Sequence, residues 1–209
     1  MFLEMIKSIV LGIVEGVSEW LPISSTGHMI LVNELINNTE GFTASDLYLY
    51  VIQLGAILAV VTLYFHKLNP FSPKKTNVEK ENTWKMWFKV IIACVPAAVF
   101  GLVLDNFMSA WENWQVVSAM LILYGVAFIV VESLHKETKI ESMDDMTYKT
   151  ALLIGLFQVL SIVPGTSRSG ATILGAMLIG CSRSVAAEFS FFLAIPVMFG
   201  VSLLKVLKY

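Results

Sequence analysis

The sequence predicts an all-α polytopic membrane protein: an inverted-repeat bundle with two re-entrant helical hairpins and about four full transmembrane helices. The 209-residue chain is 56% hydrophobic and 14% charged, whereas soluble domains carry about 25% charged residues. Several apolar segments are long enough to cross a bilayer. Two other apolar stretches are each interrupted by a polar turn. These observations favour one membrane domain, residues 1–209.

The first interrupted stretch covers residues 6–35. An apolar helix, Ile6–Leu21, is expected to end at Pro22, and hydroxyl residues at 24–26 can cap a second helix, Gly27–Leu35. Two short helices joined by a polar turn predict a hairpin that dips into the membrane and returns. Such irregular backbone is tolerated there only where protein or a water-filled cavity surrounds it.

Three full spans, a second hairpin and a fourth span are predicted after it. The three spans are Leu47–Phe65, Met86–Leu104 and Trp114–Leu134. The second hairpin, residues 151–180, has apolar segments Ala151–Val163 and Ile173–Ile179 on either side of a polar turn. Each segment is too short to cross a bilayer. The fourth span is Val185–Leu207.

The distribution of lysines predicts the orientation of these spans. Lysine-free Asp105–Asn113 lies between two lysine-rich loops, which carry Lys67, Lys74, Lys75 and Lys80, and Lys136, Lys139 and Lys149. Loops rich in lysine usually remain in the cytoplasm. The first hairpin is therefore expected to open to the outside and the second to the cytoplasm.

The two hairpins also match each other in sequence. An ungapped alignment lays Gly12, Ser18, Ser24 and Gly27 on Gly155, Ser161, Ser167 and Gly170. This predicts a first repeat over 1–134 and a partial second repeat over 151–209. The three intervening spans turn the second copy upside down, an arrangement that occurs in transporters with broken helices.

The polar turn of the second hairpin, Pro164–Thr172, predicts an anion site. Arginine at membrane depth is costly and by default marks a function, and the guanidinium of Arg168 matches the geometry of a phosphate or diphosphate. Glycines allow the backbone to approach a ligand closely, and hydroxyls donate hydrogen bonds, although helix capping alone would also explain the hydroxyls. The candidate ligands around the arginine are Gly165, Ser167, Ser169, Gly170 and Thr172.

Two carboxylates in the first hairpin are candidates for chemistry. Glu15 and Glu19 share one face of the predicted helix, where bare carboxylates repel each other. A shared proton, Arg168, or a divalent cation such as Mg²⁺ or Ca²⁺ must compensate for this repulsion.

The turn that follows supplies further candidates. Ser25 is the candidate nucleophile, and His28, three residues later, is the candidate acid or base. A satisfied interior histidine is the alternative. Ser24 and Thr26 are candidate substrate ligands, with capping as their alternative role.

The segments Glu15–His28 and Pro164–Thr172 closely resemble the two signature motifs of the bacitracin-resistance type undecaprenyl-diphosphate phosphatases, and the resemblance covers essentially the whole chain. It implies hydrolysis of a C55 isoprenoid diphosphate to its monophosphate, which recycles the lipid carrier of cell-wall synthesis. It also implies a divalent cation and an active site on the outer side of the bacterial cytoplasmic membrane. Family members usually continue beyond the position of Tyr209 with two further spans.

The resemblance also implies roles for individual residues. The glutamate pair of the family falls on Glu15 and Glu19, which would hold the metal or supply a base, and its serine, histidine and arginine fall on Ser25, His28 and Arg168. Its phosphate-contacting hydroxyls fall on Ser167, Ser169 and Thr172.

Several alternatives remain open at this stage. The same anion site would serve a polyprenyl-phosphate flippase or transporter; a structural membrane subunit would leave the buried charges unexplained. Attack by Ser25 and attack by a metal-activated water are equally compatible with the sequence. The expected partners are a polyprenyl diphosphate and the bilayer, with a homodimer left open. A net charge of −2 gives no case for nucleic acid. The sequence predicts no role for Glu188.

Overall fold

The computed structural model describes residues 2–36, 38, 41–108, 111, 114–134 and 137–208, and the regular secondary structure in this part of the chain is helical. An isolated bridge between Ile140 and Cys181 is the one β-type pairing recorded there. The predicted all-α class is confirmed. Lys136 and part of Asp105–Asn113, both used to predict the orientation, lie outside the described residues.

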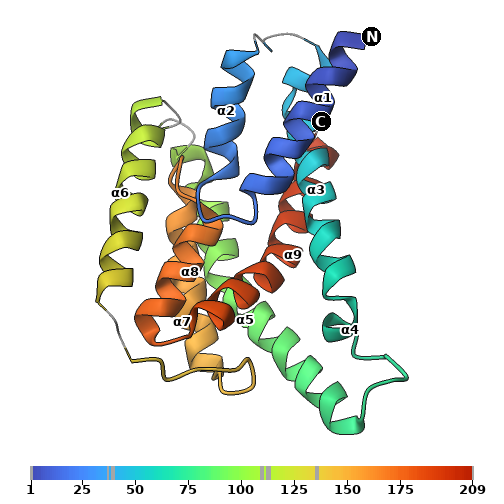
Figure 1. The fold of residues 1–209 in the computed structure, drawn as a ribbon, viewed down its shortest axis with the longest axis vertical. Coiled ribbons are helices and arrows are strands. Elements are labelled where there is room, and N and C mark those ends of the chain that lie inside the picture. Colours follow the sequence, from blue (N-terminus) through green and yellow to red (C-terminus); the bar gives the residue numbers. More distant parts are fainter. Residues whose placement is uncertain are drawn as a thin grey trace.

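The first predicted hairpin is a pair of contacting helices, α1 (Phe2–Ser18) and α2 (Ser25–Leu35), here called the first helix pair (Figure 1). The predicted boundary at Leu21 is wrong, because α1 ends at Ser18 and Glu19 lies in the turn. Pro22 explains the early end, since proline has no amide hydrogen to donate to the Ser18 carbonyl and its ring would clash with that carbonyl in a continuing helix. The amide of Glu19 nevertheless still donates to the carbonyl of Glu15 at 2.9 Å.

Three helices occupy the positions predicted for the first spans: α3 (Asp46–Leu63), α5 (Asn77–Met108) and α6 (Trp114–Ser133). Two short helices, η1 (Phe42–Ala44) and α4 (Phe65–Leu68), flank α3. α5 begins at Asn77, earlier than the predicted Met86, because Thr76 and Glu79 form a reciprocal cap: the Glu79 amide donates to the Thr76 hydroxyl at 3.3 Å, and the Thr76 amide donates to the Glu79 carboxylate at 2.7 Å.

The second predicted hairpin consists of α7 (Tyr148–Gln158), the short helix η3 (Val159–Ile162) and α8 (Arg168–Ile179), here called the second helix pair. α8 ends at Ile179 and is capped by Gly180, whose φ of 107° is readily adopted by glycine. The last helix, α9 (Arg183–Lys208), corresponds to the predicted fourth span.

Three of the described helices are long and apolar enough to cross a membrane: Asn77–Leu104, Gln115–Ser133 and Arg183–Leu204. The apolar part of α3, Leu47–Leu63, is shorter, as are the helices of the second pair. Three of the four predicted full spans therefore have spanning length. The re-entrant course of the helix pairs, the inverted repeat and its boundaries stay predictions.

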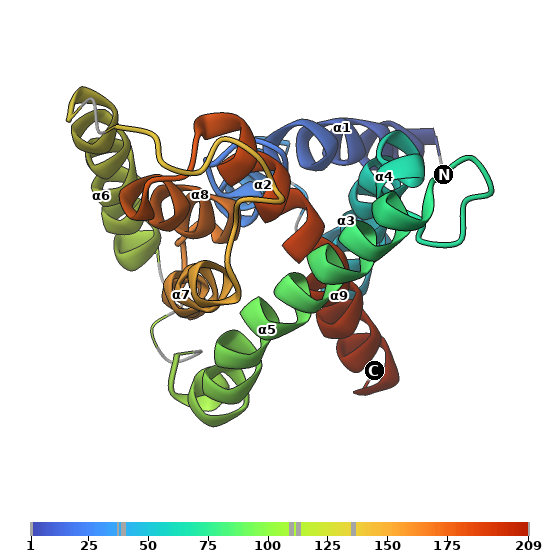
Figure 2. The same cartoon turned by 90° about the horizontal axis from the view of Figure 1, so that it is seen from below.

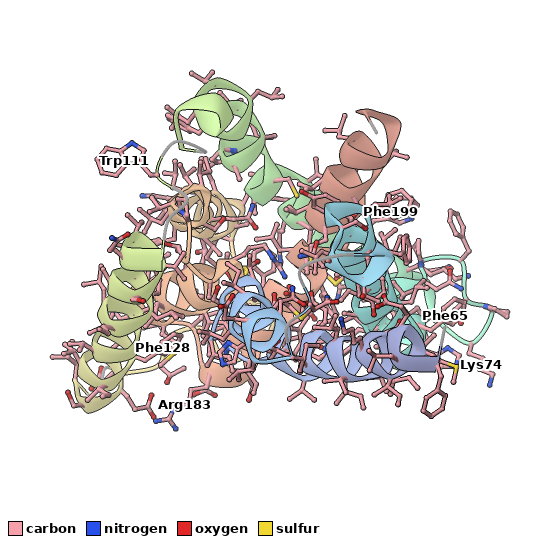
Figure 3. All side chains as sticks on the ribbon, turned by 90° about the horizontal axis from the view of Figure 1, so that it is seen from above. Phe65, Lys74, Trp111, Phe128, Arg183 and Phe199 are labelled. Atoms are coloured by element: carbon pink, nitrogen blue, oxygen red, sulfur yellow. The ribbon has the colours of Figure 1, made fainter. Side chains whose placement is uncertain are left out.

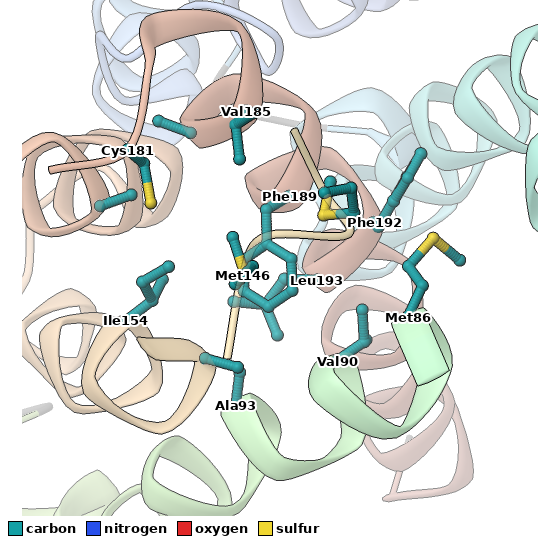
Figure 4. Close-up of a cluster of buried hydrophobic side chains, with 14 of the residues drawn as sticks. Met86, Val90, Ala93, Met146, Ile154, Cys181, Val185, Phe189, Phe192 and Leu193 are labelled. Atoms are coloured by element: carbon teal, nitrogen blue, oxygen red, sulfur yellow. The ribbon is translucent and has the colours of Figure 1, made fainter. Parts of the chain in front are cut away.

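The main hydrophobic core lies where α5, α7, α8 and α9 meet, together with the segment that precedes α7 (Figure 4). Gly155 allows α7 to approach α5 closely, because an added Cβ would lie 2.3 Å from the carbonyl oxygen of Ala93. The fully buried side chains of this core include Val90, Ala93, Ile154, Phe189, Phe192 and Leu193.

The outside of the bundle is apolar. α6 stands at its edge beside α8, and no residue of its apolar stretch is fully buried (Figures 1 and 2). Phe65, Trp111 and Phe199 are more than half exposed and lie at the periphery (Figure 3). Such a surface suits hydrocarbon rather than water.

The described parts of the two lysine-rich loops lie at one end of the bundle (Figure 1). The Lys89 ammonium, in the N-terminal half of α5, donates to the carbonyl of Met143 at 2.9 Å. Nearby, Lys67 forms a 2.6 Å ion pair with Glu188 of α9, which identifies the partner of that glutamate. The first turn of α9 is also held, since Arg183 pairs with Glu132 of α6.

Candidate active site

The two helix pairs meet at their turns, and the contact is ionic. Arg168, the first residue of α8, donates through Nη2 to Oε1 of Glu19 at 2.6 Å, across 149 residues of sequence. The Ser169 hydroxyl donates to the carbonyl of Leu21 in the same turn at 3.3 Å. The expected convergence of charged groups from both hairpins is present in the structure.

The other carboxylate oxygen of Glu19 accepts a hydrogen bond from Ser25. The Ser25 hydroxyl donates to Oε2 at 2.6 Å, and both residues are buried, with exposed fractions of 7% for Ser25 and 8% for Glu19. A hydroxyl that donates to a carboxylate has its proton aimed at a base, the arrangement that activates a serine nucleophile. Glu19 therefore links Arg168 to Ser25.

Helix α9 also contacts the arginine side chain. The Arg168 Nη1 donates to the carbonyl of Ser190 at 3.5 Å, and Nη2 also lies 3.3 Å from the sulfur of Met198. The hydroxyls of Thr172 and Ser190 lie 2.7 Å apart and join α8 to α9 at the same residue, Ser190, whose carbonyl accepts from Arg168. Because both hydroxyls are almost completely buried, they fix α8 against α9 and lie away from solvent.

A cavity of about 270 Å³ opens beside this ion pair. Hydroxyls, one amide and the Arg168–Glu19 pair form its polar side, and three side chains of α9 form an apolar wall. A small polar cavity with one guanidinium and many donors suits a phosphate or diphosphate group. The cavity is lined by Glu19, Ser24, Ser25, Thr26, Gln53, Ser161, Thr166, Ser167, Arg168, Ser169, Val197, Met198 and Val201.

Two helix N-termini are directed at the cavity. The hydroxyls of Ser24 and Ser167 cap α2 and α8 by accepting from the amides of Gly27 at 3.4 Å and Gly170 at 3.1 Å. Helix N-termini carry partial positive charge and favour anions. Ser24 has a φ of 63°, a left-handed conformation that is uncommon outside glycine and that often occurs at functional sites.

Glu15 and Thr172 are predicted site residues that lie outside the cavity lining. Glu15 is 2% exposed, and its Oε1 has no hydrogen-bond partner among the described residues. The Thr172 hydroxyl bonds to the carbonyls of Arg168 and Ser169 as well as to Ser190, which gives it a supporting position.

Three further predicted residues also lie outside this lining. His28 bonds through Nδ1 to the carbonyl of Ser24 at 2.9 Å, and no hydrogen bond between Ser25 and His28 is recorded in the described chain. Gly165 lines a second cavity of about 130 Å³ that shares Ser24 with the first. Its φ of 84° and an added Cβ only 2.5 Å from Val117 Cα show why glycine is required. Gly170 contributes its amide to the cap of α8.

The carboxylates are compatible with a divalent cation, although the described residues contain no group of three or more His, Cys, Asp and Glu side chains. Mg²⁺ is commonly held by one or two carboxylates together with substrate phosphates and water. The unpartnered, buried Oε1 of Glu15 is a ligand atom of the required type. Each oxygen of Glu19 has one partner and retains a second lone pair.

The sequence reasoning missed Gln53 and the apolar wall of α9. Gln53 had a detectable signal, since it is the one polar side chain between Tyr50 and Thr62 of an apolar helix. Ser161 had a weaker one, because the internal alignment pairs it with Ser18. No sequence signal identifies Val197, Met198 and Val201 as cavity residues, since an apolar residue on a spanning helix is equally expected to face lipid.

The chain matches known proteins over nearly its whole length. Residues 8–209 match the family described as bacitracin resistance protein BacA. The chain is 58% identical over 212 residues to an undecaprenyl-diphosphatase of Enterococcus faecalis, covering 100% of this chain and 77% of the relative. It is 59% identical over 210 residues to an undecaprenyl-diphosphatase of Limosilactobacillus fermentum, covering 99% and 76%. The same name is borne by a Streptococcus thermophilus protein, 58% identical over 210 residues and covering 99% and 73%.

Proposed function

The chain belongs to the BacA family of bacitracin resistance proteins, and on that premise we propose that it is an undecaprenyl-diphosphatase, a multi-pass membrane enzyme that hydrolyses undecaprenyl diphosphate to undecaprenyl phosphate and inorganic phosphate. The observation that carries this proposal is the linked set Arg168–Glu19–Ser25 at the meeting point of the two helix pairs. The relatives' shared name favours hydrolysis over the transporter alternative.

The diphosphate binds in the 270 Å³ cavity. Arg168 and the N-termini of α2 and α8 offset its negative charge, and the hydroxyls of Ser167 and Ser169 donate hydrogen bonds to its oxygens. The apolar wall of α9 receives the start of the isoprenoid chain, which would otherwise be exposed to water.

The short hydrogen bond from Ser25 to Glu19 supports a serine nucleophile. Ser25 Oγ attacks the terminal phosphorus while its proton passes to Glu19, and the bond from that phosphorus to the bridging oxygen breaks, releasing undecaprenyl phosphate. Water then attacks the phosphoserine. Glu19 returns its proton to Ser25 as the phosphorus–Oγ bond breaks, and both hydrogens of the water leave with inorganic phosphate. Arg168 stabilises the charge that develops in both steps.

Direct attack by water remains the competing route, with Glu19 as its base and Ser25 as a phosphate ligand. His28 keeps its predicted role as an acid or base, and because Nδ1 is bonded to Ser24, Nε2 is the nitrogen that would exchange a proton.

Ser25→Ala distinguishes attack by serine from attack by water. If Ser25 is the nucleophile, Ser25→Ala loses turnover, and acid-quenched wild-type enzyme contains phosphoserine. If water attacks directly, Ser25→Ala keeps residual turnover, and the wild type contains no phosphoserine.

Glu15 and Glu19 would hold a divalent cation, Mg²⁺ or Ca²⁺, which supplies positive charge to the diphosphate oxygens. The partnerless Glu15 oxygen supports this proposal. Chelation of divalent ions from purified enzyme is expected to lower phosphate release, and adding back Mg²⁺ or Ca²⁺ to restore it. Full turnover in chelator would remove the cation from the proposal.

The enzyme is proposed to lie in the bacterial cytoplasmic membrane with its cavity facing outward. Support comes from the two lysine-rich loops, whose described parts lie at one end of the bundle, opposite the end to which the first helix pair opens (Figure 1).

The test of the proposed function is inorganic phosphate released from undecaprenyl or farnesyl diphosphate by purified protein in detergent. Arg168→Ala should reduce release by at least about 100-fold, because it removes the cavity's cation. Arg183→Ala is the matched control: it removes the chain's other arginine, which is exposed and pairs with Glu132. No release by the wild type, or equal release by both variants, contradicts the proposal.

A further inference from the structure

Gln53 has no role in the reaction described so far, yet it lines the cavity. It lies on α3, which belongs to neither helix pair. From residue 51 to residue 61 this helix is otherwise apolar. A polar side chain in such a helix normally hydrogen-bonds to a neighbouring helix, because an unpaired amide is costly in hydrocarbon.

No protein partner accounts for the amide. Among the described residues, no hydrogen bond to the Gln53 side chain is recorded. Its amide atoms are also not among the fully enclosed, unpartnered atoms of the described chain, unlike those of Gln158. The Gln53 amide therefore faces the open space of the cavity.

The packing of α3 fixes this direction. Ile57, one helical turn after Gln53, is 3% exposed and packs against Ala194 and Met198 of α9. Met198 also lines the cavity and lies 3.3 Å from Arg168 Nη2. The face of α3 that carries Gln53 is therefore the face turned toward the arginine.

We propose that Gln53 is a substrate-binding residue, whose amide N–H donates to a phosphate oxygen of the lipid diphosphate. Its part in turnover rests on the function proposed above. An uncharged donor suits this wall, because it orients an oxygen without adding an ionic partner for Glu19. The amide also needs no proton exchange, so its contribution belongs to binding rather than to bond cleavage.

Two substitutions of similar size separate this role from packing. Gln53→Met keeps the length and removes the donor, and loss of a hydrogen bond to a charged group should lower kcat/KM for farnesyl diphosphate by about 10- to 100-fold, mainly through KM. Gln53→Glu should lower it further, because a carboxylate repels phosphate. Thr62→Val is the matched control on α3, since Thr62 is exposed and bonds only within its own helix; its kcat/KM should stay within about twofold of wild type.

Binding is measured separately by calorimetric titration with farnesyl diphosphate, and folding by the melting temperature in detergent. Weaker binding by Gln53→Met at an unchanged melting temperature supports the contact. Wild-type binding and kcat/KM in Gln53→Met, or equal values for the Met and Glu variants, overturn it. Binding without phosphate release by the wild type would contradict the proposed function and leave the Gln53 contact supported by its own titration.

Discussion

At the scale of single residues, Glu19 is where the two helix pairs are connected chemically. One of its oxygens accepts from Arg168 and the other from Ser25. The sequence suggested each of these residues separately, but it favoured His28 as the partner of Ser25 because of their spacing. The tight turn ahead of Pro22 instead brings Glu19 to the serine, and turn geometry of this kind is not encoded by helical spacing.

Glu19→Gln should test the carboxylate as a base. The substitution keeps the shape and one acceptor oxygen but removes the charge and replaces the other oxygen with an NH2 donor, so kcat should fall by about 100- to 10,000-fold, as expected when general-base catalysis is lost. Glu188→Gln is the control, because Glu188 is paired with Lys67 away from the cavity. Phosphate release by the two variants is compared at equal melting temperature. A Glu19→Gln enzyme with near-normal kcat would exclude Glu19 as the base.

Thr172 is predicted to act by positioning Arg168. Thr172→Val removes the hydroxyl that links α8 to Ser190 and should reduce kcat/KM about tenfold, the effect of losing a buried hydrogen bond. Thr172→Ser retains the hydroxyl and should restore most of that activity. The melting temperatures of the two variants should be similar. If Thr172→Val instead loses activity only in proportion to a lower melting temperature, Thr172 has a purely structural role.

At the scale of helices, local signals predicted most elements. The caps at Ser24 and Ser167 are short-range hydrogen bonds, and the apolar runs that became α6 and α9 are long enough to be recognised. The start of α5 was misplaced because hydropathy detects only its apolar part, whereas the Thr76–Glu79 cap extends the helix through polar residues. The contact between α5 and α7 was not predictable from either signal.

Gly155→Ala tests that contact. The new Cβ would meet the Ala93 carbonyl, so α7 and α5 must separate, at a cost of about 1–3 kcal/mol that should lower the melting temperature. Gly125→Ala is the control: nothing lies within 4 Å of its added Cβ on α6, and alanine is the better helix former. If the melting temperature of Gly155→Ala is no lower than that of Gly125→Ala, the close contact between α5 and α7 is incorrect.

At the scale of the whole molecule, the convergence of the two helix pairs was expected from the sequence, whereas contacts made by the other helices were not. The pairing of Lys67 with Glu188 joins residues 121 apart, and Gln53 reaches the cavity through the packing of α3 on α9. Such contacts depend on which face each helix turns toward its neighbours. The pattern of apolar residues says little about this orientation, because both lipid and core are apolar.

The membrane orientation can be tested with single cysteines in a variant that lacks Cys94 and Cys181. Lys74→Cys and Glu141→Cys lie in the two lysine-rich loops and should react with a membrane-impermeant maleimide only after cells are permeabilised. Phe42→Cys, in the exposed segment between α2 and α3, should react in intact cells. The reverse labelling pattern would require the cavity to face the cytoplasm.

The pairing of Arg168 with Glu19 has a consequence for how the lipid arrives. The guanidinium is already paired with one carboxylate before any ligand enters, so it offsets only part of the charge of a multiply charged headgroup. Electroneutrality would then have to be restored by a counterion that accompanies the headgroup. Apparent affinity should therefore rise with divalent salt at constant ionic strength, whereas an equivalent amount of sodium should leave it unchanged.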